Sequence, residues 1–199
     1  GLFRKRFRLE MPSNANKQSG AIHRYRAVMS VQGADIQHKI STDFFLSNPN
    51  SLDEKVQCIN YVISDPVNGP LVPVSTLITD VRLLLNAGAN TVRIAQNTQN
   101  PHFLDQCEKQ GLSVLLEIPV FQVPNGFLTD EIFIRSSLDQ LTSMIDRDGR
   151  YACVAGWGIG DGIESPNESN MQYYVTLINH IRKIDNRPVF ASVNWSGDT

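Results

Sequence analysis

The sequence predicts an α/β protein with the architecture of a (β/α)8 TIM barrel, of which this chain holds about five strands. Short β-branched runs alternate with amphipathic helices from residue 77 onward, a pattern typical of βα units on a parallel sheet. Polar residues follow each predicted strand. The composition, 41% hydrophobic and 19% charged, excludes a disordered or coiled-coil chain.

Hydrophobic spacing and helix-ending residues define the elements of the regular part. Apolar residues at helical spacing predict four helices, and Gly88 and Gly111 stand at the ends of the first two, where glycine commonly terminates a helix. Pro101 at the start of the second helix fits the preference of proline for the first turn. The predicted helices span residues 77–86, 101–110, 130–146 and 167–184, and the predicted strands span 91–95, 113–119, 152–159 and 188–193.

The first 75 residues show weaker patterns. Residues 26–31 are a candidate for the opening strand of the barrel, and residues 52–62 are interpreted as a short helix or strand. Prolines 66, 70 and 73 together with Gly69 indicate a loop before the regular part. We therefore expect a basic N-terminal tail or linker over residues 1–25 and a barrel domain over residues 26–199.

A doubly wound nucleotide-binding sheet is the competing architecture. Gly156, Gly158, Gly160 and Gly162 follow a strand and superficially suggest a phosphate-binding loop. A dinucleotide site needs a helix that opens directly at its last glycine, whereas residues 163–166 intervene here. The lysine of a P-loop is also missing from this segment. The barrel is therefore the favoured interpretation, and the sequence predicts no cofactor.

Polar and aromatic residues at the strand ends predict a carbohydrate site. In a barrel the carboxyl ends of the strands face one pocket, and a combination of aromatic, amide and carboxylate groups suits a sugar ring and its hydroxyls. An internal salt bridge between Glu117 and Arg93 would explain that acid equally well. The expected substrate-binding residues are Arg93, Asn97, Glu117, Trp157, Asn194 and Trp195.

Three segments in order resemble the catalytic barrel of family-two glycoside hydrolases, which includes β-galactosidases and β-glucuronidases. That family has a helix leading into a "G-x-N-x-V-R" strand, an "F-L-D-x-C-D-x-x-G-L" helix before a strand that closes in an acid and proline, and a "W-x-x-G-N-E" strand. The resemblance implies a retaining, two-carboxylate hydrolysis of O-glycosidic bonds. The matching segments are residues 80–94, 102–119 and 154–160, followed by an "R-P-V" at 187–189.

The resemblance breaks at the acid/base position. The glutamate that follows Gly-Asn in the family is Gly162 here, and the asparagine is Asp161. Asp161 and Glu164 are the candidate replacements for the acid, although a solvated loop acid or a helix-capping role would also explain Glu164. The resemblance places the nucleophile on a later strand, beyond Thr199.

Two functions from different classes follow. One is a glycoside hydrolase with a displaced acid, and the other is a catalytically inactive barrel that binds carbohydrate or serves a structural role in a larger, possibly membrane-linked, protein. The retained Arg93, Glu117 and Trp157 favour at least sugar binding, whereas Gly162 favours inactivity.

Charge and cysteine usage limit the partners. Seven of the 18 Lys and Arg residues lie within residues 1–26, so a membrane or partner domain is an expected attachment for this end, with a solvated linker as the alternative. The three cysteines and four histidines lack metal-type spacing, and no metal is predicted. Carbohydrate is the expected ligand and nucleic acid is not. The expected location is membrane-associated or extracytoplasmic.

Overall fold

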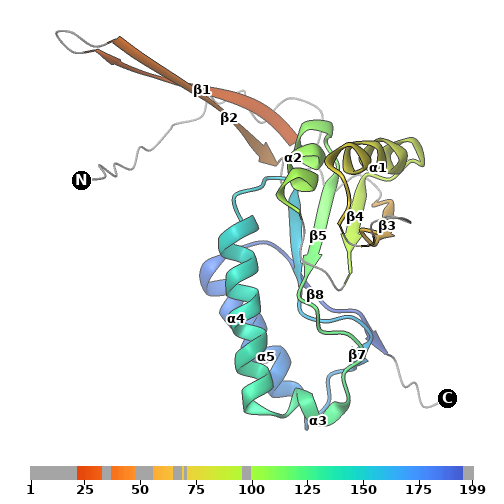
Figure 1. Ribbon diagram of the computed structural model, residues 1–199. Coiled ribbons are helices and arrows are strands. Elements are labelled where there is room, and N and C mark those ends of the chain that lie inside the picture. The colour runs from red at the N-terminus through yellow and green to blue at the C-terminus, as the bar shows by residue number, and fades with distance from the viewer. Residues whose placement is uncertain are drawn as a thin grey trace.

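The computed structural model of the chain describes residues 22–32, 37–47, 56–64, 69, 71–95 and 100–194. Figure 1 shows a layer of helices beside a parallel sheet, with a long two-stranded hairpin at one end. The helices are α1 (Val74–Asn86), α2 (Pro101–Gln110), α3 (Asn125–Leu128), α4 (Glu131–Asp148) and α5 (Met171–Ile184). The strands are β1 (Ile22–Gln32), β2 (Gln37–Ser47), β3 (Cys58–Tyr61), β4 (Thr91–Ile94), β5 (Ser113–Glu117), β6 (Val154–Gly158), β7 (Ile163–Glu164), β8 (Val189–Phe190) and β9 (Val193–Asn194).

Five parallel strands form the central sheet in the order β3-β4-β5-β6-β8. Arg93 of β4 lies opposite Asn60 of β3 on one side and Leu115 of β5 on the other. Each strand is added beside the previous one, with no reversal of direction across the sheet. A doubly wound sheet reverses its order at a switch point, so the predicted barrel-type α/β fold is confirmed.

The helix ends follow the local chemistry of the sequence. Asn100 caps α2 by accepting a hydrogen bond from the His102 backbone N–H at 2.9 Å, and Gly111 ends this helix in the left-handed conformation with φ 78°. Asp130 caps α4 by accepting from the Phe133 N–H at 2.8 Å. The four predicted helices and the predicted strands at 91–95, 113–119 and 152–159 are confirmed, with ends that shift by a few residues. The single strand expected over 188–193 is instead two short strands, β8 in the central sheet and β9 paired with β7.

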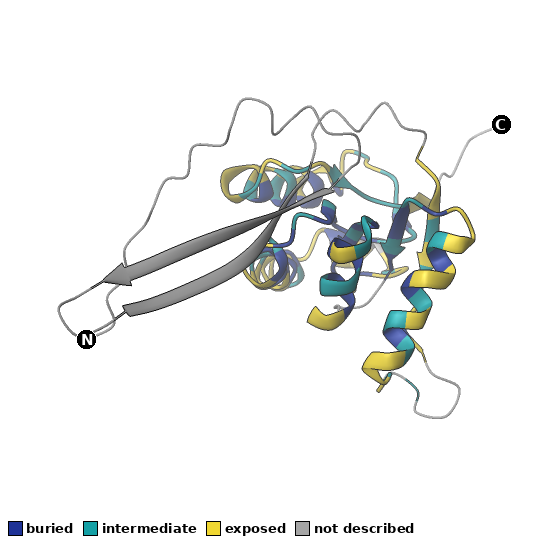
Figure 2. Cartoon of the chain, turned by 90° about the horizontal axis from the view of Figure 1, so that it is seen from above, coloured by how far each residue is buried: buried dark blue, intermediate teal, exposed yellow. Residues whose placement is uncertain are grey.

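The core lies between the sheet and its helices. In Figure 2 the helix faces that turn toward the sheet are buried and the outer faces are exposed. Burial of this apolar surface is the main stabilising contribution to such a layer. Fully buried members include Val92, Ile94, Val114 and Trp157 from the strands, and Leu77, Val81, Phe103, Leu141 and Tyr173 from the helices.

The chain before residue 75 differs from the expectation. The first strand of the sheet is β3, which lies within the 52–62 segment; residues 52–55 fall outside the described part. Residues 26–31 do form a strand, but they belong to β1, which pairs with β2 in a separate sheet. The expectation that they open the barrel is therefore wrong, because β1 pairs with β2 in a separate antiparallel sheet.

The hairpin pairs β1 with β2 in an antiparallel register. Tyr25 lies opposite Phe44, Arg26 opposite Asp43 and Met29 opposite Ile40. The boundary expected after residue 25 falls inside β1, and the division into tail and domain remains a prediction.

Two side chains hold the start of β6 and the helix before it. The Glu108 carboxylate on α2 accepts a hydrogen bond from the Ala152 backbone N–H. Arg187 donates from Nη2 to the Gly149 carbonyl at 2.7 Å, directly after α4. These contacts fix the chain where it enters the strand that leads to Asp161. No helix in the described ranges is long and apolar enough to cross a membrane.

The environment of Glu108 generates a prediction about pH and stability. Burial raises the pKa of its carboxyl, and hydrogen bonds from the Ala152 and Cys153 backbones offset this only in part. The folded protein therefore keeps this proton to a higher pH than the unfolded chain does. Folding stability accordingly falls as the pH rises from the ordinary glutamate pKa through the raised one.

We expect Glu108→Gln to remove this pH-dependent loss of folding stability, because the glutamine side chain does not ionise. Its amide oxygen can still accept the hydrogen bond from the Ala152 N–H. Urea unfolding of the full chain between about pH 4 and about pH 7 should show a smaller loss of stability in the variant than in the wild type. Glu168→Gln is the matched control, since Glu168 is exposed. Parallel stability curves for wild type and Glu108→Gln would contradict the prediction.

Candidate functional site

A guanidinium and two carboxylates meet at the carboxyl ends of the central strands. Arg93 Nη2 lies 2.7 Å from Glu117 Oε2 and 2.8 Å from Asp161 Oδ1. Arg93 Nε also donates to Glu117 Oε2 at 3.2 Å. We call these three residues the Arg93 cluster. The structure thus brings together three of the residues predicted from the sequence, and it includes the predicted salt bridge.

Mutual pairing stabilises the charges of the Arg93 cluster. The Glu117 side chain is fully buried, while Arg93 and Asp161 each keep 14% of their side-chain surface exposed. Burial of Arg93 disfavours its charged form, but hydrogen bonds to Asp161 and Glu117 outweigh this and raise the pKa of the guanidinium above its usual value. Arg93 is therefore a permanent cation that compensates a buried carboxylate, which would be costly without a partner.

An aromatic ring borders the Arg93 cluster on the β8 side. Phe190 is half-buried, and its ring centroid lies 6.0 Å from Arg93 Cζ. The approach requires glycine at position 158, because a Cβ there would lie 2.3 Å from Glu117 Cβ and 2.8 Å from Phe190 Cζ. Sequence reasoning missed Phe190. The available signal was the Gly156-x-Gly158 alternation, since glycine inside a strand often marks a close approach.

The position expected for the acid/base glutamate, residue 162, has a backbone conformation that favours glycine. Gly162 has φ +60°, and a Cβ there would lie 3.1 Å from Gln122 Cγ. Asn194 Nδ2 donates to the Gly162 carbonyl at 2.7 Å, so this predicted substrate-binding residue joins β9 to the loop. A non-glycine residue in this left-handed conformation costs about 1 kcal/mol and would press against the Gln122 side chain.

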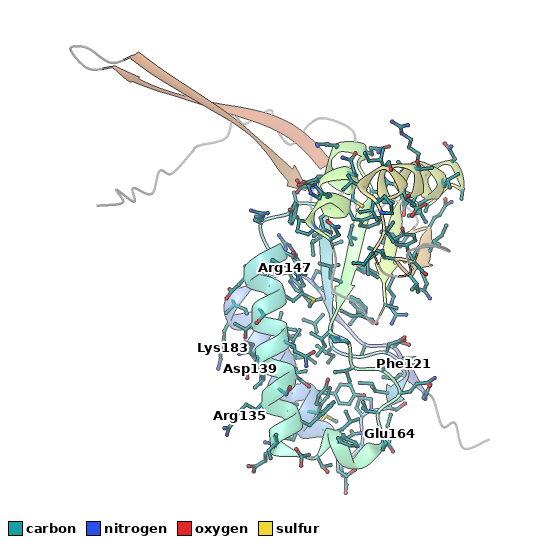
Figure 3. The ribbon with its side chains drawn as sticks, in the orientation of Figure 1. Phe121, Arg135, Asp139, Arg147, Glu164 and Lys183 are labelled. Atoms are coloured by element: carbon teal, nitrogen blue, oxygen red, sulfur yellow. The ribbon has the colours of Figure 1, made fainter. Side chains whose placement is uncertain are left out.

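Glu164 is directed toward α5 rather than toward the Arg93 cluster. Its Oε2 lies 3.4 Å from Asn170 Nδ2, and its backbone carbonyl accepts a hydrogen bond from the Tyr174 hydroxyl. Figure 3 shows Glu164 near α3, at the opposite end of the molecule from the hairpin. Of the two candidate acids, only Asp161 lies in the cluster, and Arg93 already binds it.

Trp157 belongs to the core instead of the expected sugar platform. Its side chain is fully buried, and Arg187 Cζ lies 5.4 Å from its ring. Successive strand residues point to opposite faces, so Trp157 points away from the side on which Gly158 meets Glu117. The expectation that Trp157 contacts substrate is therefore not supported by this arrangement. The other two predicted binding residues, Asn97 and Trp195, lie outside the described residues.

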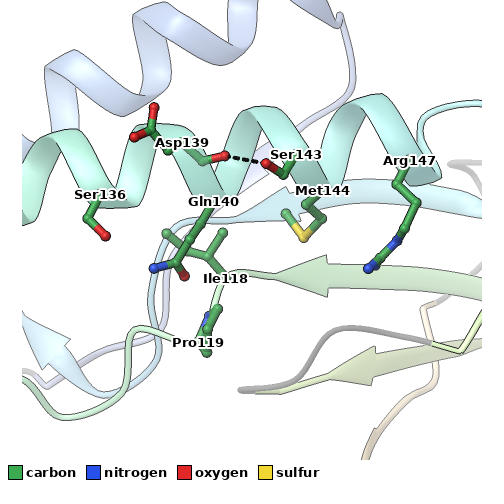
Figure 4. A pocket seen from close by; sticks show the side chains of 8 residues that line it. All are labelled: Ile118, Pro119, Ser136, Asp139, Gln140, Ser143, Met144 and Arg147. Carbon is green, nitrogen blue, oxygen red and sulfur yellow. Dashed lines mark hydrogen bonds between the residues drawn. The ribbon is translucent and has the colours of Figure 1, made fainter.

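A cavity of about 400 Å³ lies elsewhere, between α4 and the segment after β5 (Figure 4). None of the predicted site residues lines it, and Arg147 in its wall is paired with Asp148 at 2.5 Å. Within the described ranges no group of three or more His, Cys, Asp or Glu residues is placed to hold a metal ion. The cavity is lined by Ile118, Pro119, Ser136, Asp139, Gln140, Ser143, Met144 and Arg147.

Two relatives of known identity each match about half of this chain. A β-galactosidase from Pseudoalteromonas haloplanktis is 29% identical over 100 residues, which are 48% of this chain and 10% of that protein. A β-glucuronidase from Mus musculus is 28% identical over 116 residues, or 57% of this chain and 18% of that protein. The chain therefore spans only a small part of these relatives.

Solved structures share the fold. An FMN-binding β-glucuronidase from Facaelibacterium prausnitzii L2-6 superposes with a TM-score of 0.70 at 17% identity, covering 88% of this chain and 29% of that one. A β-galacturonidase from Eisenbergiella tayi bound to galacturonate gives 0.65 at 22% identity, covering 83% of this chain and 28% of that one.

The family model for "Glycosyl hydrolases family 2, TIM barrel domain" matches residues 50–197. This match covers most of the described sheet and helices, as well as every member of the Arg93 cluster. It also agrees with the motif segments and with the unbroken strand order. The chain therefore belongs to the family 2 glycosyl hydrolases, and the matched residues form part of their TIM barrel domain.

Proposed function

We propose that this barrel binds carbohydrate at the carboxyl ends of β4, β5, β6 and β8 and does not cleave it by the family's acid/base route. The observation that carries the proposal is the state of the acid/base position. Gly162 has no side chain, and its left-handed backbone conformation would strain any other residue. A general acid must reach the leaving oxygen of the glycosidic bond, and this position has no group to do so.

The neighbouring carboxylate does not replace that acid. Asp161 Oδ1 is held by Arg93 at 2.8 Å, and a nearby cation favours the ionised form of a carboxyl group. General acid catalysis in glycosidases needs the opposite, a carboxyl group that keeps its proton near neutral pH. Asp161 is therefore better suited to hold the strand ends and to accept hydrogen bonds from sugar hydroxyls.

Sugar binding is supported by the chemistry beside the Arg93 cluster. A half-buried Phe190 ring lies next to charged groups whose oxygens can accept hydrogen bonds. Aromatic faces pack against the apolar face of a pyranose, and a few fixed polar groups set its orientation. Membership of a glycosidase family supports carbohydrate as the ligand. Attachment to a membrane or partner domain through the basic N-terminal segment remains a prediction, because residues 1–21 lie outside the described part.

A second candidate function is hydrolysis with Glu164 as a displaced acid. Family membership favours it, and Glu164 lies two residues beyond the family position. Its engagement with Asn170 and α5 is the argument against it. Catalysis by Glu164 would require the β7 segment to turn toward the Arg93 cluster.

Replacing the aromatic ring tests sugar binding. We expect Phe190→Ala to weaken oligosaccharide binding about tenfold, because a ring contact contributes roughly 1 kcal/mol beyond its buried area. Titration calorimetry on the whole natural protein, with neutral oligosaccharides first chosen on a glycan array, measures the effect. Phe127→Ala is the matched control, since Phe127 is an exposed phenylalanine on α3. Equal affinity for wild type and Phe190→Ala would remove this ring from the site.

A kinetic experiment separates binding from hydrolysis. We expect the whole protein to show no turnover of aryl β-galactosides or β-glucuronides that depends on Glu164 or Asp161. If the wild type hydrolyses them and Glu164→Gln lowers kcat by about a hundredfold, the size typical of a lost general acid, the hydrolase interpretation replaces ours. Asp161→Asn reports in the same assay on the other candidate.

A further inference from the structure

We propose that Phe121 and Gln122 form a second carbohydrate contact beside the Arg93 cluster, so that the ligand is an oligosaccharide of at least two units. Both residues belong to the segment that follows β5, and Figure 3 shows Phe121 beyond the carboxyl end of that strand. The inference rests on the proposed carbohydrate site and names the residues that extend it.

Hydrogen bonds of the backbone fix the position of Phe121. The Asp161 N–H donates to the Val120 carbonyl at 2.8 Å, and the Gln122 N–H donates to the Asp161 carbonyl at 3.0 Å. Phe121 and Asp161 are thereby paired in a parallel β-bridge. Residues paired in this way share one face. The Phe121 side chain therefore leaves the bridge on the side to which Asp161 turns to reach Arg93.

The Phe121 ring is open to solvent although its backbone is held. The residue is 43% exposed, and the two strands that it follows and accompanies, β5 and β6, are interior strands of the central sheet. Strands added at either edge of that sheet would not come between Phe121 and Asp161. A fixed aromatic side chain loses little freedom when a ligand packs on it, so this ring suits stacking on a sugar.

The conformation of Gln122 indicates a use for its side chain. Its φ is +46°, a left-handed conformation that is uncommon for residues other than glycine and that occurs often at ligand-binding sites. The side chain folds over Gly162, where a Cβ would lie 3.1 Å from Gln122 Cγ and 3.8 Å from its Nε2. Within the described part of the chain, the Gln122 amide forms no hydrogen bond. Its donors and its acceptor are therefore open to sugar hydroxyls.

The two rings, Phe121 and Phe190, lie at different points along the chain of β6 and its extension. Phe190 is paired with Gly158 from the β8 side, and Phe121 is paired with Asp161 from the β5 side. These two partners are three residues apart, which corresponds to about 10 Å of extended chain. Aromatic positions with this separation suit neighbouring units of a saccharide rather than a single unit.

Ligand length tests the inference on the whole natural protein. An oligosaccharide is first chosen on a glycan array, and its two-unit and one-unit methyl glycosides are then titrated by calorimetry. We expect Phe121→Ala to weaken binding of the two-unit ligand about tenfold and to leave the one-unit ligand unaffected. Phe190→Ala should weaken binding of both. Phe127→Ala, at an exposed phenylalanine on α3, is the matched control.

Gln122→Gly removes the amide without disturbing the fold. Glycine adopts a positive φ without strain, so the urea midpoint of unfolding should not fall in this variant. Affinity for the two-unit ligand should fall about fivefold, as expected for the loss of one hydrogen bond. Gln172→Ala, at an exposed position on α5, is the matched control and should leave the affinity unchanged.

The outcomes separate this inference from the proposed function. Unchanged affinity for the two-unit ligand in either Phe121→Ala or Gln122→Gly, while Phe190→Ala weakens it, would overturn the inference and leave the carbohydrate site in place. A lower urea midpoint for Gln122→Gly would assign that residue a structural role and would also overturn it. Failure of every glycan to bind would overturn the proposed function itself, and the inference with it.

Discussion

The ion pair between Arg93 and the fully buried Glu117 is the constraint on which the strand ends depend. A buried carboxylate needs a partner, since an uncompensated charge in the interior costs several kcal/mol. Arg93 supplies that partner from β4 to β5, and its Nη2 extends the bridge to Asp161 after β6. Three neighbouring chain segments are thereby joined at the end of the sheet where barrel proteins bind ligands.

This constraint limits the chemistry of the neighbouring positions. Glu117 and Phe190 both pack against residue 158 only because it is glycine, so β6, which leads to Asp161, lies close against the cluster. Asp161 is bound by Arg93, and the chain then turns at Gly162, which has φ +60°. A side chain at residue 162 would be strained by this backbone conformation and would press against Gln122. The Arg93 cluster and the glycine at the acid position are thus adjacent parts of one local arrangement.

The regular elements were predictable because their signals are local. Proline and glycine mark both ends of α2, and the apolar spacing of α5 matches its buried face. In α4 the spacing predicts Leu141 and Ile145 correctly but not Ile132, which is 80% exposed. The salt bridge of Glu117 was also predictable, since a buried acid requires a partner. Side-chain direction was not. Trp157 was expected to be a ligand contact, but strand alternation turns it into the core, and the role of Phe190 depends on neighbours from three strands that no single segment reveals.

This chain keeps the barrel of its family but not the glutamate at the acid/base position, and the two can differ for a physical reason. The matching segments are helix ends, buried strand residues and the Arg93–Glu117 pair, all of which maintain the scaffold. A scaffold of this kind persists as long as its core and caps are kept, whatever the strand-end loops contain. The loops decide the chemistry, and here they hold a glycine at the acid position. Retention of the barrel therefore argues for a carbohydrate ligand, while the glycine at the acid position argues against the family's acid/base step.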